Sequence, residues 1–264
     1  MHHPLDHLLA LILAVLFPLR AALFGFRRLK RAPLDQLPAV RRSVYRDAIV
    51  IQWSLVAALV ALWLGFHRRW GALGLELRLT PGLTGVVLGM LLIVVLLLRQ
   101  RAEVIRDREM LTALRRRMDK LEVMLPHTSD EFRRFAWLAV TAGVCEELLY
   151  RGFMIAYLSN WMDVLPAAAV SSVIFGIGHS YQGVKGVLQT AALGAFLAAL
   201  YLVSGSIYVG MAIHALMDLH SGHLMMKAYT RQAEEEREVA AESGWLDEDG
   251  ASGIGGDPEP AGGA

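Results

Sequence analysis

The chain has a single cysteine, Cys145, among its 264 residues, and this residue lies within an apolar stretch. One cysteine can build neither a disulfide framework nor a cysteine metal site within one chain. The sequence also has almost no net charge, +1 at pH 7, and residues Met1 to Asp6 lack the positive region that opens a signal peptide. We therefore expect a retained first helix and no removable targeting segment.

Apolar residues are in excess, at 55% of the chain, whereas soluble domains contain roughly 45–50%. The basic residues are clustered, with seven Lys and Arg between Arg27 and Arg46 and ten between Arg99 and Arg134. Both clusters lie between long apolar stretches, where the positive-inside rule places cytoplasmic loops. This pattern predicts a lipid bilayer as the surrounding solvent and argues against a nucleic-acid partner.

Stretches of about 20 mostly apolar residues are long enough to span a bilayer. The sequence predicts an all-α fold, a polytopic transmembrane bundle of about seven helices. The first stretch is the weakest, because Pro18 and Arg20 interrupt it. The predicted spans are residues 8–26, 48–66, 80–98, 135–158, 164–178, 186–203 and 206–226.

Four regions follow from this pattern. We expect N-terminal transmembrane helices with a basic cytoplasmic loop over 1–98 and a cytoplasmic amphipathic helix over 99–127. Residues 128–228 form the predicted catalytic core, and the acidic, Gly-rich tail over 229–264 is expected to be disordered because it cannot build a core. The basic loops predict an external N-terminus and a cytoplasmic C-terminus. The expected location is a bacterial inner (plasma) membrane.

Three ionisable residues, Glu146, Glu147 and Arg151, occur together inside an apolar stretch. A charge at the centre of a membrane helix costs about 2.5–3.5 kcal/mol by insertion scales, so each needs a partner or a function. Glu147 and Arg151 are four residues apart, with the acid first, which favours an ion pair within one helix. Glu146 lies about 100° around the helix from Glu147 and has no partner there, which makes it the candidate for chemistry.

The later apolar helices contribute His179, and His214 with Asp218 four residues further on. Two imidazoles and two carboxylates on three successive apolar helices are best satisfied if they converge in one cavity. In one mechanism, Glu146 and His179 activate a water while His214 stabilises an oxyanion. In the other, His179, His214 and Asp218 bind zinc and Glu146 acts as base on the metal-bound water. The residue types alone leave both open.

These residues form three motifs, Glu-Glu-x-x-x-Arg, Phe-x-x-x-His and His-x-x-x-Asp, in that order. Together they resemble the CPBP (Abi) family of intramembrane proteases, which includes the CaaX prenyl-protein endopeptidases. The resemblance covers about residues 135–218, roughly a third of the chain. It implies that Glu146 and His179 activate water, that His214 and residue 218 serve the oxyanion, and that Glu147 and Arg151 support the site.

The resemblance also favours a glutamate-dependent mechanism with no required cofactor, and ranks zinc second. One departure is Asp218, where the prenyl-processing enzymes carry Asn. An ionised Asp cannot donate a hydrogen bond, so Asp218 must be protonated, orient His214 or bind a metal. The resemblance does not carry over a CaaX substrate. The expected partner is a membrane-embedded or lipid-anchored protein or peptide.

Two other functions use the same residue types. Buried Glu, His, Asp and Arg also mark ion pathways, so an ion- or proton-coupled transporter is one alternative. The other is a non-catalytic membrane scaffold that retains the fold. Among the remaining histidines, His220 and His223 are predicted to be interfacial, with a metal role as the alternative, and His67 and His127 lie in predicted loops and receive no role.

Overall fold

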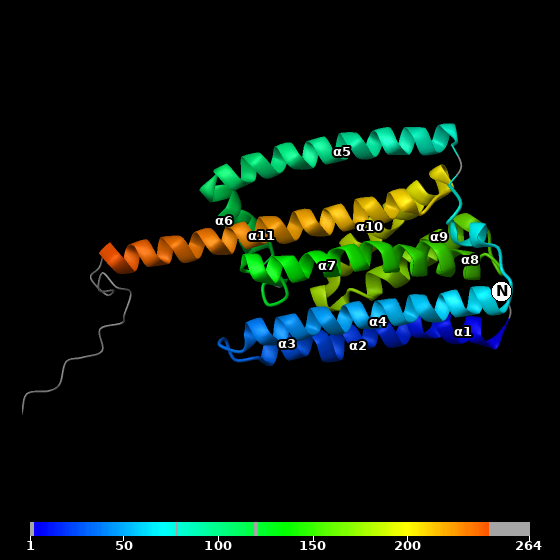
Figure 1. Ribbon diagram of the computed structural model, residues 1–264, viewed down its shortest axis with the longest axis horizontal. Helices are drawn as coiled ribbons and strands as arrows, with labels where there is room; N and C mark the ends of the chain where they lie inside the picture. The colour runs from blue at the N-terminus through cyan, green and yellow to red at the C-terminus, as the bar shows by residue number, and fades with distance from the viewer. Residues whose placement is uncertain (1–2, 78, 119–120, 243–264) are drawn as a thin grey trace, which may run out of the picture.

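The computed structural model describes residues 3–77, 79–118 and 121–242, and their regular structure is entirely helical. The long helices run lengthwise beside one another (Figure 1). The N-terminal rod contains α1 (Pro4–Leu11), α2 (Phe17–Arg20) and α3 (Arg27–Arg31), joined by π-helical turns. The other α-helices are α4 (Leu37–Gly65), α5 (Pro81–Arg106), α6 (Arg108–Met118), α7 (Ser129–Glu146), α8 (Ile155–Leu158), α9 (Val164–Ile177), α10 (Gly183–Ser204) and α11 (Tyr208–Glu242).

Each of the seven predicted spans is helical in the structure. Within the described residues, four helices are long and apolar enough to cross a membrane: Pro4–Arg31, Leu37–Gly65, Pro81–Arg106 and Ser180–Ser204. Only a minority of their residues are buried inside the bundle, as expected for helices whose side chains face lipid. The predicted all-α membrane bundle is therefore confirmed.

The N-terminal rod stays continuous through Pro18, which sits in the first turn of α2. Proline lacks a backbone donor and crowds the preceding turn, and the widened turns Ile12–Leu16 and Ala21–Phe26 accommodate it. Arg68, just beyond α4, donates two hydrogen bonds to the buried Asp6 carboxylate, at 2.6 and 2.8 Å. This ion pair ties the start of the rod to the end of α4.

Helix α7 lies at the centre and packs most extensively against α11 and α4. Its Gly143 allows the two backbones of α7 and α11 to approach closely, because a Cβ at this position would lie 2.8 Å from the nitrogen and Cβ of Ala215. Residues that follow Gly143 on α7 therefore face residues near Ala215 on α11. This packing positions the candidate site.

The predicted amphipathic helix over 99–127 differs from the structure. The membrane helix α5 continues to Arg106, and a separate short helix, α6, carries the amphipathic pattern with Leu111 buried. The break falls at Asp107, whose backbone is extended and whose side chain accepts a hydrogen bond from the Met110 amide at 3.1 Å. Aspartate is a strong N-cap, so it starts a new helix here.

The prediction of a disordered tail over 229–264 is wrong for its first part, because α11 continues to Glu242. Glu, Arg, Gln and Ala are good helix formers, and side-chain pairs four residues apart support this extension. Examples are Arg231 with Glu235, at 3.8 Å, and Gln232 with Glu236, at 2.5 Å. Residues 243–264 of the predicted tail lie outside the described part of the chain.

Both basic clusters lie at one end of the bundle. Figure 1 shows α3, α6 and the far end of α11 at that end, with the N-terminus at the opposite one. Clusters of Arg and Lys on one side are what the positive-inside rule requires of cytoplasmic loops. The arrangement is compatible with an external N-terminus and a cytoplasmic C-terminus, which remain predictions.

Candidate active site

The candidate site forms where α7 becomes the π-helical segment Glu147–Met154. Glu146 is the last residue of α7 and Glu147 the first residue of the wider turn, and both are buried. Across from them, His214 lies on α11 and is 4% exposed. The close contact at Gly143 brings these two elements together.

Polar side chains from two other helices, α4 and α11, flank the Glu146 carboxylate. The Gln52 side chain on α4 donates from Nε2 to Glu146 Oε1 at 3.1 Å. The other carboxylate oxygen, Oε2, lies 3.8 Å from His214 Nε2, which is longer than a hydrogen bond. One oxygen is thus held by an amide, and the other faces an imidazole without bonding to it.

Glu147 is bound to both Arg151 and His214. Arg151 NH1 lies 2.8 Å from Glu147 Oε1, so the predicted ion pair is present, and both side chains are almost completely buried. The same carboxylate oxygen lies 3.0 Å from His214 Nδ1. Arg151 also donates to the Gly194 carbonyl at 3.2 Å and lies over the Phe175 ring, 4.3 Å from its centroid. Glu147 therefore fixes the orientation of His214.

His179 follows α9 and is partly buried. Its Nδ1 lies 2.9 Å from the Phe175 carbonyl oxygen, which can only accept, so Nδ1 carries the hydrogen. In the neutral ring Nε2 then carries the free lone pair. The Phe175 ring packs against both imidazoles, with centroids 4.9 Å from His179 and 6.0 Å from His214. Phe175 therefore connects His179 to the rest of the site.

Asp218 lies one turn beyond His214 on α11, and its Oδ2 is 3.8 Å from His214 Nε2. Its side chain is 40% exposed, in contrast to the buried Glu146 and Glu147. The predicted i, i+4 arrangement on one face of the helix is present. The carboxylate stands near the nitrogen that faces Glu146.

The zinc hypothesis requires His179, His214 and Asp218 to converge on one point. Over the described residues, no group of three or more His, Cys, Asp or Glu side chains is arranged to hold a metal ion. The Nδ1 atoms of His214 and His179 are engaged by Glu147 and by a backbone carbonyl, which leaves the two Nε2 atoms as the nitrogens that could ligate a metal. As these side chains are placed among the described residues, they do not form a zinc centre, and no step of the mechanism is assigned to a metal.

Gln52 was not among the residues predicted for the site, and it lies 94 positions before Glu146 in the chain. A polar residue inside an otherwise apolar span is the one signal that marks it. Two other histidines have partners at the basic end: His223 Nε2 lies 3.2 Å from Arg101, and His127 stacks on Tyr229. Neither of these two contacts the Glu146 cluster.

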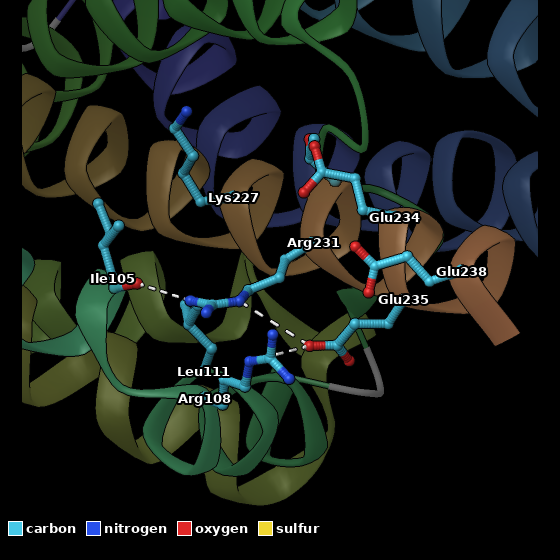
Figure 2. A pocket seen from close by; sticks show the side chains of 9 residues that line it. Ile105, Arg108, Leu111, Lys227, Arg231, Glu234, Glu235 and Glu238 are labelled. Carbon is cyan, nitrogen blue, oxygen red and sulfur yellow. Dashed lines mark hydrogen bonds and ion pairs between the residues drawn. The ribbon is translucent and has the colours of Figure 1, made fainter.

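Away from the candidate site, a hollow of about 290 Å³ lies between α5, α6 and the C-terminal half of α11. Figure 2 shows Arg108 and Arg231 directed at Glu235, to which they lie at 3.6 and 3.8 Å. Arg231 also donates to the Ile105 carbonyl at 3.1 Å. The charges that line this hollow are of both signs, and none of the candidate site residues lines it.

Comparison with known proteins bears on the same segment. Residues 128–220 match the family model described as type II CAAX prenyl endopeptidase Rce1-like. The matched segment contains Glu146, Glu147, Arg151 and the residues from His179 to Asp218, but not Gln52. No curated protein and no solved structure matches the chain.

Proposed function

We propose that this chain is a glutamate-dependent intramembrane endopeptidase, because residues 128–220 match the family model of Rce1-like type II CAAX prenyl endopeptidases. The observation that carries the proposal is the buried Glu146 carboxylate, with one oxygen facing an imidazole that Glu147 holds in place. A carboxylate in a water-poor site is a suitable general base. The substrate is a membrane-embedded or lipid-anchored protein or peptide.

In the proposed reaction, Glu146 accepts a proton from a water, with the free Nε2 of His179 as a second acceptor. The water oxygen bonds to the peptide carbonyl carbon, and the carbonyl oxygen becomes an oxyanion. Protonated His214 donates from Nδ1 to Glu147 and from Nε2 to the oxyanion. The tetrahedral intermediate then collapses, the C–N bond breaks, and the proton held by Glu146 passes to the leaving amine nitrogen.

Glu147 and Arg151 act through His214. A carboxylate at Nδ1 stabilises the imidazolium that the oxyanion needs, and Arg151 compensates the charge of that carboxylate. Asp218, near Nε2 of His214, serves the oxyanion as a protonated donor in the proposed mechanism. An ionised Asp218 would repel the oxyanion.

The test uses purified protein in liposomes with two substrate panels, prenylated CaaX-type peptides and unprenylated transmembrane peptides. Wild type is expected to cleave members of one panel, which identifies the substrate class. Glu146→Gln is expected to lose about 10²–10⁴-fold in rate, the usual contribution of a general base. Cleavage that is abolished by a chelator and restored by zinc would contradict the metal-free mechanism. Absence of any cleavage would favour the transporter or scaffold.

A further inference from the structure

Gln52 is the polar contact of the candidate site that comes from outside the matched segment. It lies in the middle of α4, a helix that is apolar enough to cross the membrane. Its side chain is 4% exposed and turned inward, toward α7. A buried amide in such a helix is unfavourable unless its hydrogen bonds are satisfied.

Only one end of the Gln52 amide is satisfied by the protein. Nε2 donates to Glu146 Oε1 at 3.1 Å, while the buried Oε1 of Gln52 has no hydrogen-bond partner among the described residues. Buried acceptors without a partner are rare, and each calls for an explanation such as a water or a ligand. This free acceptor belongs to the same amide that holds Glu146.

We propose that Gln52 is a positioning residue for hydrolysis, which orients the Glu146 carboxylate through Nε2 and accepts a hydrogen bond from the attacking water through Oε1. The inference rests on the proposed peptidase function. Since Nε2 occupies Oε1 of Glu146, the proton of the water is directed to Oε2, the oxygen that faces His214. The N-terminal helices thereby complete a site whose other residues lie within 128–220.

The chain offers a matched control on the same helix. Trp53 also links α4 to α7, by donating from Nε1 to Thr141 Oγ1 at 3.3 Å, and makes no polar contact with Glu146. Trp53→Phe therefore removes a second hydrogen bond between the same two helices. Gln52→Met keeps the length of the side chain and removes both the Nε2 donor and the Oε1 acceptor.

Steady-state cleavage in liposomes separates positioning from packing. Gln52→Met is expected to lower kcat about 10- to 100-fold with KM within about twofold, because the lost bonds involve the base and the water rather than the substrate. Trp53→Phe should retain the wild-type kcat. Equal kcat values for wild type and Gln52→Met would overturn the inference, as would equal losses in both variants, which indicate a packing effect.

Infrared spectroscopy tests the contact without depending on activity. The difference between wild type and Glu146→Gln assigns the carboxyl band of Glu146. Gln52→Met is expected to shift this band and Trp53→Phe to leave it in place. If wild type cleaves nothing, the proposed function fails and the band alone decides the contact: a shift supports it, and an unmoved band overturns it.

Discussion

Replacing Glu147 by Gln is expected to destabilise the protein, whereas the same change at the adjacent Glu146 is not. Glu147 is 1% exposed and lies 2.8 Å from Arg151 and 3.0 Å from His214. Gln preserves the volume but leaves the buried guanidinium without its counter-charge. Breaking a buried ion pair in this way costs about 3–5 kcal/mol. The bond from Arg151 to the Gly194 carbonyl and its contact with the Phe175 ring remain, so the lower end of this range is expected.

Glu146→Gln provides the comparison. Among the described residues, Glu146 has no cationic partner within hydrogen-bond distance, and a glutamine there can still accept from Gln52 through its carbonyl oxygen. Its stability should stay within about 1 kcal/mol of wild type, because a buried charge is removed and the hydrogen bond is retained. Thermal unfolding in detergent measures both variants. A loss of 3 kcal/mol lowers the melting temperature by roughly 6–12 °C in a chain of this size.

The double variant Glu147→Gln, Arg151→Met tests the ion pair by removing both of its charges. Removing both charges of a buried pair is often close to neutral, so the double variant should regain much of the stability that Glu147→Gln loses. Equal melting temperatures for Glu147→Gln, Glu146→Gln and wild type would refute this prediction. A double variant that is less stable than Glu147→Gln would refute it as well.

Three further results are expected. Glu131 is 2% exposed and lies 2.6 Å from Arg41, so Glu131→Gln should lower the free energy of unfolding by about 3–5 kcal/mol. Asp130→Asn breaks only exposed ion pairs, with Arg133 and Arg134, and should leave the melting temperature unchanged. Burial and the nearby Arg41 hold the pKa of His127 below 6.5, so His127 takes up a proton when the protein unfolds at low pH. The free energy of unfolding should therefore be highest above about pH 6.5 and should fall below it. His127→Gln should show a smaller fall of the unfolding free energy over the same pH range. Asp218→Asn, which keeps a hydrogen-bond donor, should keep kcat within about tenfold of wild type. Asp218→Ala, which removes the donor, should lower kcat about 10²–10³-fold, and the reverse order would contradict the role of Asp218 as a donor.

The helices and the ion pair could be predicted because their signals are local. Apolar stretches of membrane length gave all seven helical segments, and the four-residue spacing of Glu147 and Arg151 gave the pair. Predictions from local signals were wrong at the basic end of the bundle. The N-cap at Asp107 divides the predicted amphipathic helix, and α11 extends into the predicted tail. Capping and helix propensity there outweighed the change in composition.

The long-range contacts of the site could not be read from spacing. Gln52 meets Glu146 only because α4 packs on α7, and His214 meets Glu147 because Gly143 lets α11 approach. The π-helical turn that begins at Glu147 was also not predicted, because an angle of 100° per residue describes an α-helix. The convergence of polar residues could be inferred from their cost in the membrane, but not the partner of each.

The central claim is that Glu146 is the base of an intramembrane peptidase. The most direct measurement is the rate of peptide cleavage in liposomes by wild type and Glu146→Gln at equal folded fractions, fixed by their melting curves. The account predicts cleavage by wild type and a loss of at least about 100-fold in Glu146→Gln. Cleavage by Glu146→Gln at the wild-type rate would contradict it.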